Sequence, residues 1–233
     1  MARLARVVAV DTAYHVTQRG NARRFILESE TDRRVYLDLL REHSGLQDLS
    51  LIGYCIMSNK VHLIVMPRRK DSLAMALKKT HGRYAAYWNV RKKSTGHVWQ
   101  GRYYSCPLDT AHLWAALRYT ELNPVRAGMV RTPEKYAWSS ARAHLGAGNA
   151  EESLEIDLWR SCWDAGRWRE YLASGSSEGE VEAIRKCTHT GRPLGGTEFV
   201  EKLEQKVGRR LAPQRGGRPE KGVDGRQGSL SWD

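Results

Sequence analysis

Residues 49–67 read LSLIGYCIMSNKVHLIVMP and contain the strongest structural signal in the chain. Two apolar and β-branched runs, Leu49–Met57 and Val61–Met66, are separated only by the polar residues Ser58–Lys60. Runs of this kind joined by a short polar turn are typical of an antiparallel hairpin. Pro67 ends the second run because it cannot donate to a sheet ladder. The sequence therefore predicts two paired strands.

Further extended segments flank this hairpin. Val7–Val10 and Tyr14–Gln18 are β-branched and apolar, and His97–Ser105 has the same character with a glycine bend inside it or beside it. The intervening Arg19–Asn21 predicts a turn. We expect all three extended segments to be strands.

Helix signals alternate with these strands. Four helices are expected, from Ser29 to Gly45, from Asp71 to the basic loop at Arg91, from Asp109 to Asn123, and from Thr132 to Leu145. Ser29 followed by Asp32 resembles a capped start, and the proline at 133 suits a first helical turn. The long second helix has one buried stripe: Leu73, Leu77, Thr80, Tyr84 and Trp88. Interleaved strands and helices with a hairpin indicate an α+β fold with a largely antiparallel sheet.

The composition changes after this region. Gly146–Ser153 is small and acidic and resembles a linker, and short helical stretches beyond it hold Trp159, Trp163 and Trp168. From residue 212 the chain is rich in proline, glycine and arginine, which favours a disordered basic tail. We predict three parts: a domain over 1–145, a helical extension over 146–211 and the tail over 212–233.

Charge and cysteine usage restrict the class of protein. The 233 residues carry a net charge of +12, which indicates a polyanionic partner, most naturally nucleic acid. The four cysteines form no Cys-x-x-Cys pair, so a zinc ribbon or disulfide scaffold is not expected and the thiols indicate a reducing compartment. No 18-residue apolar run exists and no apolar segment follows the first residues, so we expect a cytoplasmic protein without a membrane partner.

Basic residues cluster in one part of the chain. Arg68–Lys70, Lys78–Lys79 and Arg91–Lys93 lie close together in sequence, near Trp88 and Trp99. Cations beside aromatic rings are typical of a phosphate track with stacking platforms. Basic clusters that merely face solvent give the same pattern. The clusters alone therefore favour nucleic-acid binding and a solvent-exposed charged surface equally.

Three side chains are candidates for chemistry. Tyr119 and Asn123 lie four residues apart on a predicted helix and therefore project from one face. His62 alternates with Val61 and Leu63, so it points to the opposite face of the sheet from them. Each also has a structural interpretation: a packing tyrosine, an asparagine that ends a helix before proline, and a polar strand residue.

The order of several segments resembles the REP-associated tyrosine transposases, a branch of the single-tyrosine HUH transposases related to insertion sequence 200. The resemblance extends over nearly the whole chain except the tail. The matching segments are Tyr14–Asn21 (YHVTQRGN), Tyr54–Val65 (YCIMSNKVHLIV), Gly96–Tyr103 (GHVWQGRY), Arg118–Val130 (RYTELNPVRAGMV), Tyr136–Ser140 (YAWSS) and Thr190–Gly195 (TGRPLG).

This resemblance implies a ferredoxin-like catalytic domain that acts on hairpin-bearing single-stranded DNA. In such enzymes a tyrosine attacks a phosphodiester and retains the 5′ end as a phosphotyrosine, so that strands are cut and rejoined in DNA transposition. Two histidines of a His-hydrophobic-His strand and a side chain four residues after the tyrosine bind a divalent metal, Mg²⁺ or Mn²⁺. Carried over by position, the nucleophile is Tyr119 and the metal ligands are His62 and Asn123.

Lys60 departs from this pattern because it occupies the position of the first histidine. A protonated ammonium has no lone pair and repels a dication. Three interpretations follow: a catalytically impaired, domesticated DNA-binding or regulatory protein, a lysine that contacts the phosphate and replaces part of the metal's charge, or a substitution in an otherwise ordinary enzyme. A lysine merely exposed at the hairpin turn is the fourth.

The expected partner is single-stranded or hairpin DNA, bound by a monomer or a homodimer. RNA binding is a further alternative, because basic charge does not distinguish the two nucleic acids. The residues expected to contact phosphates are Arg19, Lys79, Arg83, Arg102 and Arg126, and exposed structural arginines would look the same in sequence.

Overall fold

Four strands form one antiparallel sheet in the computed structural model, which describes residues 8–147 and 154–212. The strands are β1 (Ala13–Arg19), β2 (Leu49–Ile56), β3 (Lys60–Pro67) and β4 (Tyr104–Leu108). Their order across the sheet is β2-β3-β1-β4. The predicted hairpin is confirmed, with Ile56 opposite Val61 and Cys55 opposite His62. The strand predicted at Tyr14–Gln18 is confirmed as β1, which places β3 and β4 on its two sides.

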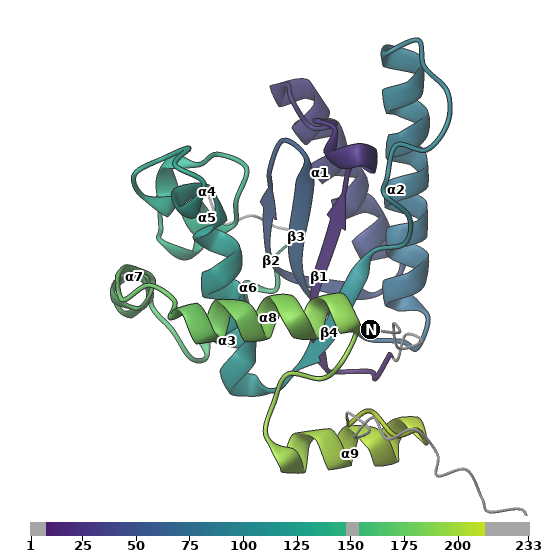
Figure 1. Ribbon diagram of the computed structural model, residues 1–233. Helices are drawn as coiled ribbons and strands as arrows, with labels where there is room; N and C mark the ends of the chain where they lie inside the picture. The colour runs from purple at the N-terminus through teal and green to yellow at the C-terminus, as the bar shows by residue number, and fades with distance from the viewer. Residues whose placement is uncertain (1–7, 148–153, 213–233) are drawn as a thin grey trace, which may run out of the picture.

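Two long helices cover one face of this sheet (Figure 1). α1 (Glu30–Leu46) begins with the predicted capping box, in which Ser29 and Asp32 satisfy each other's backbone N–H groups. α2 (Ser72–Arg91) buries its whole predicted stripe. Tyr14 and Val16 of β1 point into this layer and pack with the two helices.

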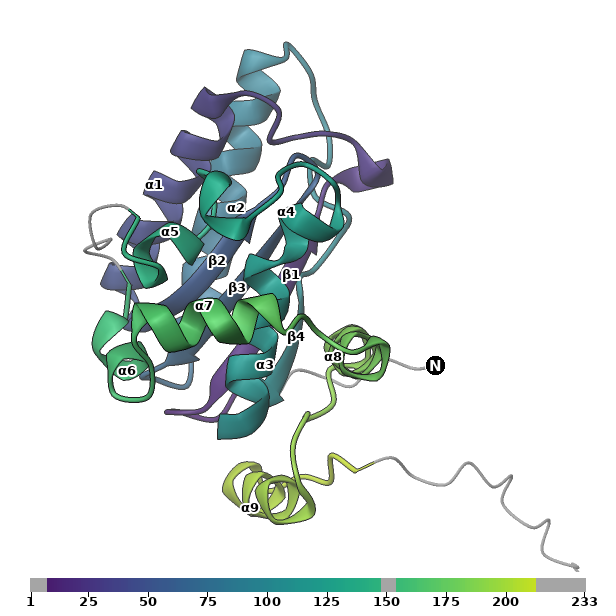
Figure 2. The ribbon, with the colours of Figure 1, turned by 90° about the vertical axis from the view of Figure 1, so that its left-hand side faces the viewer.

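The other face carries α3 (Thr110–Glu121) together with the C-terminal helices α6 (Ile156–Arg160), α7 (Ala165–Ala173) and α8 (Glu178–Thr190). Figure 2 shows α7 and α8 beside α3, on the side of the sheet away from α2. Asp109 caps α3 as predicted, by accepting from the backbone N–H of His112. Trp168 is fully buried here, so the expected tryptophan-bearing helices complete a second core.

Shorter elements connect or extend these layers. They are η1 (Asn21–Arg23), α4 (Asn123–Arg126), η2 (Pro133–Lys135), α5 (Ala141–His144) and α9 (Thr197–Val207). α9 packs its Leu203 against Ala9 and Leu211 in a small separate cluster. No helix within the described residues combines the length and apolar composition that crossing a bilayer requires.

Two predicted strands are wrong in part or whole. Residues 8–10 form no strand, since Ala9 instead packs toward α9 and its N–H donates to the Tyr14 hydroxyl; Val7 lies outside the described residues. The segment His97–Ser105 becomes a strand only from Tyr104. Gly101 has φ of 113°, which breaks the extended backbone before that point.

The single helix predicted from Thr132 to Leu145 is also wrong, because η2 and α5 stand in its place. The residues between them pair with the edge strand β2. The Ile56 N–H donates to the Trp138 carbonyl at 2.9 Å and the Ser140 N–H donates to the Tyr54 carbonyl at 3.0 Å. Extended pairing with a sheet edge and helical hydrogen bonding exclude each other, and the pairing prevails.

The order β-α-β-β-α-β with this sheet topology is the ferredoxin-like arrangement, so the predicted α+β class is confirmed. The predicted division at residues 145 and 211 stays a prediction. The linker over 148–153 and the tail over 213–233 lie outside the described residues.

Candidate active site

Tyr119 meets two histidines on the α3 face of the sheet. His15 of β1 and His62 of β3 alternate with residues of the opposite core, so both imidazoles face α3. The Tyr119 ring lies edge-on to each imidazole, with centroids 5.7 Å apart in both cases. The structure therefore brings together Tyr119 and His62, two residues selected from the sequence, and adds His15.

Hydrogen bonds fix the tautomers of the two histidines. The Thr188 hydroxyl donates to the Ile184 carbonyl at 2.7 Å, so it accepts from Nδ1 of His15, which is 2.7 Å away. Nε2 of His15 then accepts from Nδ1–H of His62 at 3.1 Å. This leaves Nε2 of His62 with a lone pair, and that atom is buried without a hydrogen-bond partner among the described residues.

Both imidazoles are held neutral. Burial, together with the nearby Lys60 ammonium, lowers the pKa of His15 to about 3. Burial also lowers the pKa of His62 well below its ordinary value, with added effects from His15, Lys60 and Arg126. A charged imidazole is disfavoured here because the site is both dry and surrounded by cations.

This burial predicts acid sensitivity. The unfolded chain takes up a proton on His15 as the pH falls below 6.5, whereas the folded protein resists protonation down to about 3. Stability is thus lost as the pH falls, by about 2 kcal/mol from His15 alone at pH 5. We expect His15→Gln to lose about 2 kcal/mol less than the wild type between pH 7.5 and 5 in urea unfolding. Equal losses in the two proteins would contradict this.

Arginines close the site around the Tyr119 phenol. Nε of Arg185, from α8, donates to the phenolic oxygen at 3.4 Å. The guanidinium of Arg126 stacks 4.1 Å from the ring centroid and donates to the Tyr119 carbonyl at 2.8 Å. Tyr119 is only 3% exposed, but both arginines that cover it are exposed side chains. Tyr119 thus belongs to the buried cluster on the α3 face, and the side chains of Arg126 and Arg185 lie between its ring and solvent.

Lys60 lies on the same face as His62, two residues before it in β3. Burial lowers the pKa of Lys60, and Arg19, Arg126 and Arg185 lower it further. Arg19 stands directly opposite Lys60 across the β1–β3 ladder. Two of the predicted phosphate contacts, Arg19 and Arg126, are therefore part of this site.

The remaining predicted phosphate contacts lie elsewhere. Lys79 and Arg83 are exposed on α2, which covers the other face of the sheet, and Arg83 pairs with Glu42 at 3.3 Å. Arg102 is exposed in the loop before β4. The structure does not bring these three residues to Tyr119.

The side chains at the expected metal position do not fit a divalent cation. The Asn123 amide group donates to the Tyr119 and Thr120 carbonyls at 3.1 and 3.3 Å, so it caps the end of α3. Lys60 supplies a positive charge where a lone pair is needed, and Nε2 of His62 is the one imidazole nitrogen of this pair left free to bind a metal. Within residues 8–147 and 154–212, no group of three or more His, Cys, Asp or Glu could hold a metal.

The sequence did not single out His15, Arg185 or Thr188. Strand alternation in Tyr14–Gln18 puts His15 on the opposite face from Tyr14 and Val16. Once β1 is paired with β3, this alternation places His15 on the same face as His62, so the sequence did contain a signal for it. Arg185 and Thr188 gave no such signal, because Thr188 is 173 residues from His15 in the sequence.

Sequence comparison assigns a family to this ferredoxin-like chain, in which a tyrosine lies beside two histidines. Residues 8–123 match the family model described as Transposase IS200 like. The chain belongs to this family, the IS200-like transposases.

Solved structures give further comparisons. A REP-associated tyrosine transposase bound to a REP hairpin is similar with a TM-score of 0.55 at 14% identity, over 66% of this chain and 98% of that one. A candidate transposase of Deinococcus radiodurans R1 gives a TM-score of 0.37 at 18% identity, over 52% of this chain and 96% of that one. The tRNA(His) guanylyltransferase of Saccharomyces cerevisiae gives 0.39 at 12%, over 82% and 83%. No curated protein matches the sequence.

Proposed function

We propose that this transposase cleaves and rejoins hairpin-bearing single-stranded DNA through a 5′-phosphotyrosine at Tyr119. The observation that carries the proposal is the phenol, which lies against two neutral imidazoles and is surrounded by cations. In the reaction the phenolic oxygen bonds to phosphorus and the bond from phosphorus to the 3′ oxygen breaks. The phenolic proton is balanced by protonation of the released 3′ oxygen, and the reverse reaction rejoins strands.

The proposal places the chain in the REP-associated branch of the family. The similar solved structure was bound to a REP hairpin, and the shared fold makes a DNA hairpin the natural substrate to test here. We propose action in the cytoplasm, as a monomer or homodimer. The described cysteines are all free thiols, which supports a reducing compartment.

A denaturation-resistant adduct tests the chemistry. Single-stranded hairpin DNA labelled at its 3′ end should become covalently attached to the wild type, because the tyrosine retains the 5′ end of the downstream fragment. Tyr119→Phe should reduce the adduct to background, since phenylalanine has no nucleophilic oxygen. Tyr87→Phe is the matched control: Tyr87 lies on α2 and its hydroxyl contacts Asp32 at 3.3 Å, away from the site.

The label position adds a second criterion. DNA labelled at the 5′ end should yield a shorter free strand and no labelled protein. A labelled adduct from the 5′-labelled strand, or an adduct retained in Tyr119→Phe, would contradict the assignment.

Lys60 favours a second candidate function, a DNA-binding or regulatory protein without cleavage. Hairpin binding by the wild type with no adduct under any metal condition would support it. Restoration of the adduct by Lys60→His would identify the lysine as the cause. Competition with an RNA of matched sequence distinguishes either DNA function from RNA binding.

A further inference from the structure

Four cations without an acidic partner lie close together at the Tyr119 site: two of them contact Tyr119, and the other two are their neighbours. They are Arg19 at the end of β1, Lys60 at the start of β3, Arg126 in α4 and Arg185 in α8. None of the four forms an ion pair with an aspartate or glutamate anywhere in the described residues. Other basic side chains of this chain do form such pairs: Arg68, Arg69, Arg83, Arg91 and Arg118.

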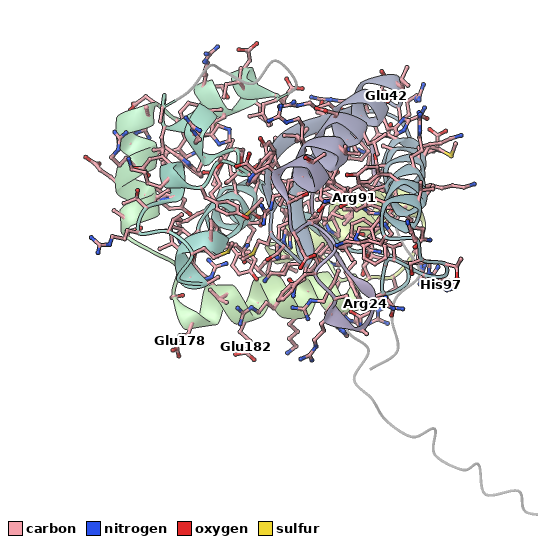
Figure 3. All side chains as sticks on the ribbon, turned by 90° about the horizontal axis from the view of Figure 1, so that it is seen from above. Arg24, Glu42, Arg91, His97, Glu178 and Glu182 are labelled. Atoms are coloured by element: carbon pink, nitrogen blue, oxygen red, sulfur yellow. The ribbon has the colours of Figure 1, made fainter. Side chains whose placement is uncertain are left out.

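The neighbourhood of Arg185 illustrates the contrast. Glu182 lies one helical turn before it, yet its side chain points outward from α8 (Figure 3), and the two residues form no ion pair. Arg185 instead donates to the phenolic oxygen. Like charges gathered at a half-buried site destabilise it unless an anion completes the arrangement.

Lys60 is likewise a cation without an acidic partner. It lies partly buried on the face that carries His62, and its electrostatic neighbours include three arginines. Its ammonium has no hydrogen-bond partner among the described side chains. An ammonium group with guanidinium groups as neighbours is suited to bind the non-bridging oxygens of a phosphate.

We propose that Lys60, Arg126 and Arg185 form a phosphate-binding site that holds the scissile phosphodiester against Tyr119, so that these cations replace the divalent metal expected in this position. The inference rests on the proposed function. Charged donors fixed beside the attacked phosphorus stabilise the charge that develops on its oxygens in the transition state. Arg185 lies beyond residue 123, so the proposal assigns a phosphate contact to the part of the chain that the family model does not match.

The first experiment measures phosphate binding without any cleavage. Inorganic phosphate should raise the melting temperature of the wild type in EDTA, relative to sodium chloride at the same ionic strength. Lys60→Gln and Arg185→Gln should each weaken the apparent affinity for phosphate about tenfold, since each removes one charged donor. Lys186→Gln is the matched control, because this exposed lysine is the next residue of the same helix and should leave the affinity unchanged.

The second experiment measures adduct formation with hairpin DNA in EDTA, Mg²⁺ and Mn²⁺. We expect the wild type to form the adduct at similar rates in all three, and Lys60→Gln to form it at least tenfold more slowly. A wild-type adduct that requires Mg²⁺ or Mn²⁺ would overturn the inference and leave the proposed function intact. Phosphate binding lost in Lys60→Gln and Arg185→Gln, with no adduct from the wild type, would support the site and contradict the cleavage function. Phosphate affinities equal in all four proteins would overturn the site.

Discussion

Replacing Glu121 by alanine should lower the free energy of unfolding by about 3–5 kcal/mol. Glu121 ends α3, two residues after Tyr119, and its side chain is completely buried. Its carboxylate accepts from the Ser140 hydroxyl at 2.6 Å, from Nδ1 of His144 at 2.6 Å and from Nε1 of Trp168 at 2.9 Å. Alanine would leave two buried donors, Nδ1 of His144 and Nε1 of Trp168, without an acceptor, and each carries the full cost of desolvation. The Ser140 hydroxyl would keep only its longer contact with the Tyr54 carbonyl, at 3.3 Å.

Urea unfolding monitored by tryptophan fluorescence and circular dichroism gives the measurement. Glu121→Gln should lose less, because its amide oxygen still accepts from one or two of the donors. Glu178→Ala is the surface control, since this glutamate points into solvent from α8 (Figure 3), and it should change stability by less than about 0.5 kcal/mol. A loss below about 1 kcal/mol in Glu121→Ala would show that water or rearranged side chains satisfy the donors.

This carboxylate also explains which parts of the fold the sequence could predict. Elements governed by local patterns were predicted correctly: the Ser29 capping box, the buried stripe of α2 and the 49–67 hairpin depend only on residues close together in sequence. The segment from Thr132 to Leu145 was not, because its conformation depends on pairing with β2 and on contacts of Ser140 and His144 with Glu121. Such long-range interactions leave no periodicity in the segment itself.

The site residues also fall into those that local sequence patterns predict and those that depend on long-range packing. Tyr119 and Asn123 could be assigned from helical spacing and His62 from strand alternation, but the spacing did not reveal that the Asn123 amide would cap α3. The role of α8 could not be predicted at all, because Arg185 and Thr188 reach the site only through the packing of the C-terminal helices on β4 and α3.

Arg118 links α3 to α7 and α8 through polar contacts. Its side chain is 6% exposed and donates two hydrogen bonds to the Glu180 carboxylate, at 2.8 and 2.9 Å. It also donates to the Ser174 hydroxyl at 3.0 Å and stacks 3.9 Å from the centre of the Tyr171 ring. One side chain of α3 thus contacts α7, α8 and the turn between them. Both bonds to Glu180 come from Nη2, and hydrogen bonds between charged groups are stronger than those between neutral ones.

We therefore expect Arg118→Ala to lower the free energy of unfolding by about 2–4 kcal/mol, since the remaining carboxylate of Glu180 is partly exposed and water relieves some of the cost. Amide hydrogen exchange over Glu178–Thr190 should accelerate at least tenfold more than exchange in β1 and β3. The substitution removes the ion pair that holds α8, whereas the hydrogen bonds between β1 and β3 are unchanged. Arg160→Ala, which removes an exposed pair with Asp157, should alter neither quantity measurably.

Arg118 immediately precedes Tyr119, and Glu180 lies five residues before Arg185, so this ion pair connects the helix that carries the phenol to the helix that covers it. If α8 contributes to the reaction, Arg118→Ala should slow adduct formation even at temperatures where the domain stays folded, and Arg185→Gln should add little further loss in that background. Glu180→Gln should reproduce part of the effect while leaving Arg118 in place. Full adduct rates in Arg118→Ala, with α8 exchanging rapidly, would mean that Tyr119 works without the C-terminal helices and that Arg185 only shields it.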